Sequence, residues 1–199
     1  MILVTGAGGK TGLAVLRALA RSNLAARAFT RSSTQAQAAV AAGAADCITG
    51  DLLNSAHLKA AMQDVNSLYL IAPNVHPQEF EICLGALNSA KAAGVERVVY
   101  HSVLHPQITS MPHHWKKLQV EEALIESGLG FAILQPAAYM QNVLAHLAVV
   151  RKTGRLEVPY SPETRHSLVD LEDVAEAAAE MLTGTFYSGG IYELAGPEM

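Results

Sequence analysis

The chain has 199 residues, a formal net charge of −4 and a hydrophobic fraction of 50%. This length predicts one domain with a buried core. No basic block stands out, which argues against a nucleic-acid partner, and no apolar run is long enough to span a membrane. Residues 1–5 read at once as a strand and lack the features of a signal peptide, so we expect a cytoplasmic protein.

Apolar runs alternate with Ala- and Leu-rich amphipathic stretches along the first two thirds of the chain. We predict strands at residues 2–5, 26–30, 46–49, 67–71, 97–102 and 130–134, and helices at residues 11–21, 34–42, 55–62, 78–93 and 113–127. This alternation predicts an α/β fold, a doubly wound parallel sheet of Rossmann type with helices on both faces.

The regular alternation of predicted strands and helices ends after Pro136. We predict a helix at residues 138–152, a short strand at 166–169, a helix at 171–182 and a final strand at 191–194. The whole chain, residues 1–199, is expected to be a single domain of Rossmann type. Residues 136–199 are expected to contribute a small C-terminal substrate lobe.

Residues 5–12 read Thr-Gly-Ala-Gly-Gly-Lys-Thr-Gly, between the first predicted strand and the first helix. Glycines in this context allow a tight turn, a close approach of the backbone to a pyrophosphate, and close packing of the helix on the sheet. The alternative is a glycine-rich turn without a ligand. We predict that the cofactor-binding residues of this loop are Gly6, Gly8, Gly9, Lys10, Thr11 and Gly12.

The end of the second predicted strand indicates which cofactor is bound. An NAD enzyme usually has an acidic residue there for the ribose hydroxyl, whereas this chain has Arg31 followed by Ser32 and Ser33. A guanidinium pairs with the 2′-phosphate that a carboxylate would repel. The residues therefore predict NADP(H), the alternative being that Arg31 is an ordinary surface arginine.

Further cofactor contacts are predicted where the other strands end, because ligands bind at the carboxyl ends of parallel strands. Asp51 can accept from the adenine amino group while Leu52 packs on the ring, although Asp51 is as well explained as a turn residue. At the nicotinamide end, the predicted residues are Ala72, Pro73, Asn74, Ser102 and Pro136. The histidines have no metal-ligand spacing, and the two cysteines form no CxxC motif, so no metal is expected.

The combination of motifs resembles the NmrA-like family of atypical short-chain dehydrogenases/reductases. The resemblance covers nearly the whole chain and rests on residues 5–12, 30–31, 50–52, 69–73, 98–102, 113, 117, 120–122, 133–142 and 168–175. It implies an NADPH-dependent quinone, azo or dye reductase, or a regulator that binds the dinucleotide without turning it over. The wider superfamily carries Tyr-x-x-x-Lys, but here His113 stands in the place of the tyrosine, four residues before Lys117. The family also continues beyond the point where this chain ends, which leaves a truncated form or an unusually small lobe.

Three residues are candidates for catalysis. His113 and Lys117 are four residues apart on a predicted helix and therefore face the same side. Lys117 can bond the nicotinamide ribose, and His113 can donate a proton near neutral pH. Tyr139 can contact substrate. The alternatives are a solvated helix face for His113 and Lys117 and packing within the lobe for Tyr139.

The sequence thus predicts an NADPH-dependent oxidoreductase that transfers hydride to a small electrophile, a quinone first. The alternative is a non-catalytic NADP(H)-sensing regulator. A nucleotide-sugar isomerase or epimerase is disfavoured, because that chemistry usually depends on the missing tyrosine. The sequence leaves a homodimer open.

Overall fold

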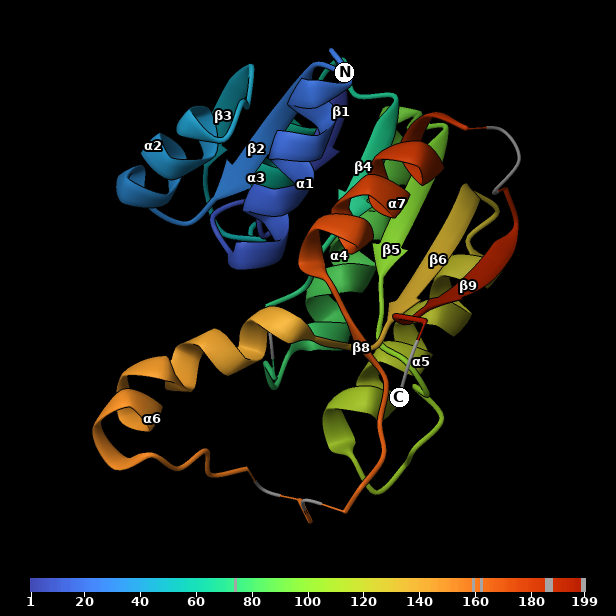
Figure 1. The fold of residues 1–199 in the computed structure, drawn as a ribbon. Coiled ribbons are helices and arrows are strands. Elements are labelled where there is room, and N and C mark those ends of the chain that lie inside the picture. The colour runs from blue at the N-terminus through green and yellow to red at the C-terminus, as the bar shows by residue number, and fades with distance from the viewer. Residues whose placement is uncertain (74, 159, 162, 185–187, 198–199) are drawn as a thin grey trace.

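The computed structural model describes residues 1–73, 75–158, 160–161, 163–184 and 188–197. Within these ranges, seven parallel strands form one sheet with the order β3-β2-β1-β4-β5-β6-β9 (Figure 1). The chain order reverses on either side of β1, which places a topological switch point between β1 and β4. The strands are β1 (Ile2–Val4), β2 (Ala26–Thr30), β3 (Asp46–Thr49), β4 (Ser67–Leu70), β5 (Arg97–His101), β6 (Gly130–Pro136) and β9 (Gly190–Leu194).

Helices cover both faces of the sheet (Figure 1). Helices α1, α2 and α7 contribute to one buried cluster, and α3, α4 and α5 contribute to the other. Their bounds are α1 (Lys10–Arg21), α2 (Ser33–Ala41), α3 (Ser55–Ala61), α4 (Glu79–Ala93), α5 (Pro112–Glu126) and α7 (Leu171–Thr183).

The central strands are buried on both faces. In β1, Leu3 packs into the cluster of α3, α4 and α5, while Ile2 and Val4 pack into the cluster of α1, α2 and α7. This two-sided burial explains why these strands read as continuous apolar runs. The predicted doubly wound α/β fold is confirmed, and the predicted elements of the first 134 residues match the observed bounds to within two residues.

The helix predicted at residues 138–152 is wrong as a single element. The chain instead forms β7 (Ala138–Tyr139), the 3₁₀ helix η1 (Met140–His146) and the α-helix α6 (Leu147–Thr153). Strand β7 pairs in parallel with β8 (Leu168–Val169), which holds its two residues extended. Neither η1 nor α6 buries a side chain. Because neither helix has a buried face, tertiary packing does not stabilise one continuous α-helix over this segment.

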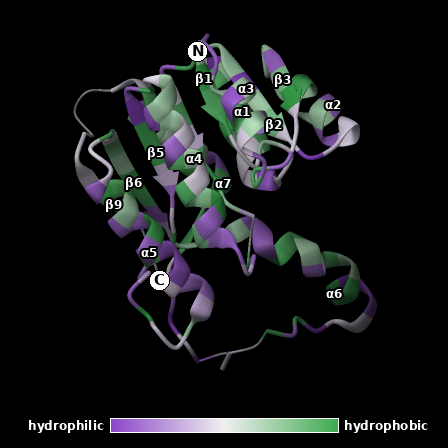
Figure 2. Cartoon of the chain, turned by 180° about the vertical axis from the view of Figure 1, so that it is seen from behind, coloured by the Kyte–Doolittle hydropathy of each residue, from purple (hydrophilic) through white to green (hydrophobic). Residues whose placement is uncertain are grey.

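The segment after Pro136 is divided between two environments. Helix α7 packs on α1, and β9 pairs with β6, so both belong to the main layers. Residues 140–158, 160–161 and 163–167, here called the arm, extend away from the sheet (Figure 1). Figure 2 shows hydrophobic residues along α6 in this projecting part. In the described part of the chain, no helix is both long enough and apolar enough to cross a membrane.

Candidate functional site

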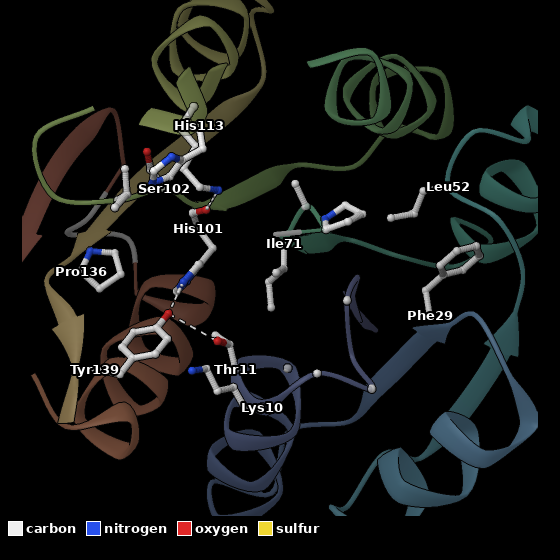
Figure 3. Close-up of a pocket in the computed structure, with 18 of the residues that line it drawn as sticks. Lys10, Thr11, Phe29, Leu52, Ile71, His101, Ser102, His113, Pro136 and Tyr139 are labelled. Atoms are coloured by element: carbon white, nitrogen blue, oxygen red, sulfur yellow. Dashed lines mark hydrogen bonds between the residues drawn. The ribbon is translucent and has the colours of Figure 1, made fainter. Parts of the chain in front are cut away.

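A cavity of about 450 Å³ lies at the carboxyl ends of β1, β4 and β5, beside the switch point (Figure 3). Its volume is in the range of roughly 300–1,000 Å³ that is typical of ligand sites. Asp51 is not among its lining residues, and Asn74 lies outside the described residues. The predicted site residues that line it are Gly6, Gly8, Gly9, Lys10, Thr11, Gly12, Arg31, Leu52, Ala72, Pro73, Ser102, His113, Lys117, Pro136 and Tyr139.

The glycine loop is packed too tightly for side chains at two positions. A Cβ at Gly12 would lie 2.5 Å from Ala7 Cα and from the carbonyl oxygen of Gly6. Gly6 itself has a left-handed φ of +58°, which favours glycine. A Cβ at Gly8 would lie 2.5 Å from the Cβ of Gln35, at the start of α2. The loop therefore brings bare backbone to the cavity floor.

Helix α1 opens toward the cavity without a side-chain cap. Gly9 is its N-cap residue and makes no side-chain hydrogen bond, and the first turn of the helix contains no acidic residue. The positive end of the helix dipole and its first N–H groups therefore favour an anionic ligand. Helix α2 differs, because the Ser32 hydroxyl oxygen accepts a hydrogen bond from the Gln35 N–H.

Arg31 lies at the end of β2, on the rim of the cavity. Its side chain is exposed, and its backbone N–H donates to Gln35 Oε1 at 3.0 Å. Leu52 and Phe29 line the same end, and both are buried (Figure 3). This end thus offers two apolar side chains beside the exposed guanidinium of Arg31.

Asp51 has local partners that match the turn interpretation. Its Oδ1 accepts from the Leu53 N–H at 3.0 Å, and its own N–H donates to His57 Nδ1 at 3.1 Å. A carboxylate that stabilises its own turn in this way is a common arrangement. The adenine contact predicted for Asp51 has no support from the cavity lining, whereas its neighbour Leu52 does line the cavity.

The charges around the cavity have one sign. The described residues that line it include the cations Lys10, Arg31 and Lys117 and no carboxylate. The chain as a whole carries −4, and Lys117 is paired with the buried Glu79, which is not part of the lining, so the positive charge facing the cavity comes mainly from Lys10 and Arg31. Such a lining favours an anionic ligand.

Ser102 follows β5 and lines the cavity, but its hydroxyl is engaged elsewhere. It donates to Glu121 Oε1, while Gln135 Nε2 donates to both carboxylate oxygens of Glu121 at 2.9 and 3.0 Å. Burial raises the pKa of Glu121, and the bonds from Ser102 and Gln135 oppose that rise. Ser102 therefore ties β5 to α5, and its hydroxyl proton is not directed at a ligand.

Lys117 reaches the cavity from α5 and forms an ion pair. Its Nζ lies 2.8 Å from Glu79 Oε1, and it also donates to the backbone carbonyl of His101 at 3.4 Å. The Glu79 side chain is 1% exposed and that of Lys117 is 13% exposed. Losing one partner would leave an uncompensated buried charge, so the pair fixes the position of the ammonium group.

His113 lies one helical turn before Lys117 on α5. Its ring packs edge-on against His114, with centroids 4.6 Å apart. Burial lowers the pKa of His113, and the neighbouring His114 and Lys117 lower it further while Glu79 opposes them. The imidazole therefore favours its neutral form, which weakens the predicted role of His113 as an acid near neutral pH.

Tyr139 belongs to a chain of hydrogen bonds that the sequence did not predict. Its hydroxyl lies 2.6 Å from His101 Nε2, and the other ring nitrogen, Nδ1, lies 2.6 Å from the hydroxyl of Tyr69. Thr11 Oγ1 donates to the Tyr139 hydroxyl at 3.4 Å (Figure 3). Burial lowers the pKa of His101 to about 3, so this histidine is neutral.

Sequence reasoning missed His101, Tyr69 and Glu79 as parts of the site. His101 was visible as a polar residue at the end of an apolar strand, which is where ligand contacts gather. Glu79 had no comparable signal, because its partner Lys117 is on another helix. Tyr69 looked like a core aromatic residue, and it is indeed completely buried.

The sheet order and the glycine-lined cavity at the switch point define this chain as a Rossmann-type α/β protein. The model of the NmrA-like family matches residues 1–196. The chain therefore belongs to the NmrA-like family, as its motifs indicated.

Two relatives match almost the whole chain. The NAD(P)H azoreductase of Xenophilus azovorans is 29% identical over 203 residues, covering 100% of this chain and 68% of the relative. Quinone oxidoreductase 2 of Escherichia coli is 30% identical over 201 residues, covering 98% of this chain and 68% of the relative.

Solved structures show the same arrangement. The crystal structure of the E. coli NADPH-dependent quinone oxidoreductase complexed with NADPH superposes with a TM-score of 0.87 at 29% identity, covering 100% of this chain and 70% of that one. The Citrobacter triphenylmethane reductase has a TM-score of 0.86 at 21% identity, covering 99% of this chain and 70% of that one. The second likeness is evidence for the fold alone.

Proposed function

We propose that this chain is an NAD(P)H-dependent oxidoreductase that uses NADPH to reduce a small electrophile, a quinone first. The observation that carries the proposal is the cavity itself, in which three cations and an uncapped helix N-terminus meet without a carboxylate among the described lining residues. The names of the azoreductase and quinone oxidoreductase relatives support the same class of reaction.

The cavity residues fit a dinucleotide with an extra phosphate. The bare backbone of the glycine loop and the first turn of α1 would hold the pyrophosphate. Arg31 would pair with the 2′-phosphate, and Phe29 and Leu52 would flank the adenine. Lys117, held by Glu79, would reach the nicotinamide ribose. The group-by-group match along one cavity supports NADPH over NADH.

The protein's task at the nicotinamide end is to position the substrate and stabilise charge. A bound NADPH supplies the hydride, with its two electrons, and one proton from solvent completes the reduction of a quinone to a hydroquinone. Tyr139 would face the substrate oxygen that becomes negative. The tyrosine hydroxyl, 2.6 Å from His101 Nε2, would donate a hydrogen bond to that oxygen.

The absence of the tyrosine of the Tyr-x-x-x-Lys motif, where this chain has His113, favours a quinone over a simple ketone. A ketone reduced by hydride becomes a strongly basic alkoxide, which needs a proton in the transition state. A quinone becomes a stabilised hydroquinone anion, so positioning and hydrogen bonding are sufficient. His113, whose pKa is lowered by burial, fits a substrate of this second kind.

Titration with NADPH and NADH, followed by steady-state assays with quinones, azo dyes and ketones, tests the proposal. We expect tighter binding of NADPH and oxidation of NADPH in the presence of quinones. Lys117→Ala should reduce cofactor affinity or turnover. Binding of NADPH without oxidation by any acceptor would contradict the enzymatic proposal and favour the sensing regulator. An absence of NADPH binding would contradict both.

A further inference from the structure

The arrangement around His101 has two hydroxyls and one neutral imidazole. Tyr69 lies at Nδ1 and Tyr139 at Nε2, both at 2.6 Å. A neutral imidazole carries one proton, so it donates to one tyrosine and accepts from the other. The two possible tautomers therefore differ in which tyrosine is the donor. They also differ in what the Tyr139 hydroxyl can offer to the cavity.

Burial of Tyr69 selects between the tautomers. Its side chain is 0% exposed and packs in the cluster of α1, α2 and α7. Its hydroxyl has His101 Nδ1 as its acceptor within hydrogen-bond distance. If Nδ1 carried the proton, the buried Tyr69 O–H would be left without an acceptor among its hydrogen bonds in the described part of the chain, which is costly. Tyr69 therefore donates to Nδ1, and the imidazole proton resides on Nε2.

The same assignment determines the direction of the bond to Tyr139. The oxygen of Tyr139 then accepts from His101 Nε2 and from Thr11 Oγ1. A phenol oxygen that accepts two hydrogen bonds still has its own proton to donate. Tyr139 lines the cavity, so that proton is free for a ligand on the cavity side (Figure 3).

We propose that Tyr69 and His101 are positioning residues that hold Tyr139 as a hydrogen-bond donor toward the substrate oxygen. Tyr69 fixes the His101 tautomer. His101 then donates to the Tyr139 oxygen, so the Tyr139 hydroxyl keeps its own proton for a bond to the ligand. The inference deepens the proposed function and rests on it for the identity of the acceptor. The hydrogen-bond direction itself depends only on the residues of this chain.

The tautomer can be measured without substrate. Long-range proton–nitrogen NMR of the histidine rings distinguishes a protonated nitrogen from a bare one, and His101→Gln identifies the His101 signals. We expect a neutral ring with a protonated Nε2 and a bare Nδ1. In Tyr69→Phe we expect a mixture of tautomers, whereas Tyr192→Phe, which removes a sheet hydroxyl outside the cavity lining, should leave the ring unchanged.

Kinetics separates positioning from proton relay. The amide nitrogen of His101→Gln can replace Nε2 as a donor but cannot accept a proton, whereas His101→Leu can do neither. We expect His101→Gln to retain kcat within about threefold and His101→Leu to lose roughly 10–100-fold, comparable to Tyr139→Phe. Tyr69→Phe should lower kcat about threefold through its population of the wrong tautomer, with the Kd for NADPH unchanged.

Specific results would overturn the inference. A protonated Nδ1 in the native protein would reverse the direction of both bonds. Equal loss of kcat in His101→Gln and His101→Leu would make His101 a proton relay instead. If the native protein oxidises no NADPH, the proposed function fails, while the NMR result still decides the tautomer.

Discussion

The sheet with its helices, here called the body, and the arm differ in how far their apolar side chains are buried. In the layered body, strands such as β4 and β5 are covered on both faces, and Leu68 and Tyr69 are completely buried. In the arm, Leu144 is 62% exposed and Val149 is 53% exposed. The body therefore owes its conformation to packing, whereas local preferences and the short β7–β8 pairing set the path of the arm. Stability and cofactor binding should accordingly depend on the body.

The largest effect on the free energy of unfolding is expected from protonation of His101, which is buried in the body. The pKa of His101 is about 3 in the folded chain, against an ordinary 6.5 in the unfolded one. The unfolded state therefore binds a proton first as pH falls, and the free energy of unfolding drops by up to ~1.4 kcal/mol per pH unit between these values. Urea titrations from about pH 7 to pH 4 should show this slope, and His101→Gln should remove it. Parallel slopes would contradict the buried neutral histidine.

Truncating a core side chain should come next. Leu68→Ala removes a fully buried side chain from β4 and should cost about 2–5 kcal/mol of unfolding free energy, because a cavity remains. Chemical denaturation measures the change. A cost below about 1 kcal/mol would mean that the layers repack more freely than their close packing suggests.

Discrimination between NADPH and NADH should depend on the rim of the cavity, where Arg31 lies. Arg31→Ala removes the guanidinium at the end of β2 and should weaken NADPH binding roughly tenfold or more, leaving NADH nearly unchanged. Arg151→Ala removes an exposed arginine of α6 that is not among the residues lining the cavity and is the matched control. Paired titrations with both cofactors test this expectation. Equal weakening of NADPH and NADH binding by Arg31→Ala would reject the 2′-phosphate contact.

The smallest effect is expected on the arm. Leu144→Ala truncates an exposed side chain of η1 and should change the unfolding free energy by no more than about 0.5 kcal/mol. The same denaturation experiment as for Leu68→Ala provides the comparison. A loss of unfolding free energy close to that of Leu68→Ala would show that the arm is packed in solution. It would contradict the difference in burial between the body and the arm.

The sequence was most informative where local and global signals agree. The strand–glycine–helix signature and the strict alternation of elements identified the fold and most of the cavity lining, because each strand end reaches the same edge of a parallel sheet. Residues 138–152 were misjudged because their composition suits a helix, whereas the pairing of β7 with β8 joins segments about 30 residues apart.

Contacts between residues that are distant in the sequence could not be predicted from it for a similar reason. Lys117 and Glu79 meet only when α4 and α5 pack side by side. The bridge from Tyr69 through His101 to Tyr139 needs β4 and β5 paired in the main sheet and β7, from the second sheet, brought beside them. Each of these residues has an ordinary local explanation, and only the tertiary arrangement gives it a partner. Arg31, by contrast, lies close in sequence to the end of β2, so its position on the cavity could be predicted, while its role toward the cofactor stays a prediction.

The single sign of charge around the cavity has a consequence for how a ligand arrives. An anion approaching this chain first meets a net charge of −4, and at physiological ionic strength it senses individual charges only within about 8 Å. Lys10 and Arg31 therefore attract the anion over the last molecular diameter of its path rather than from a distance, whereas the charge of Lys117 is paired with that of Glu79. Added salt should leave the collision frequency almost untouched and act mainly on how long the captured anion stays.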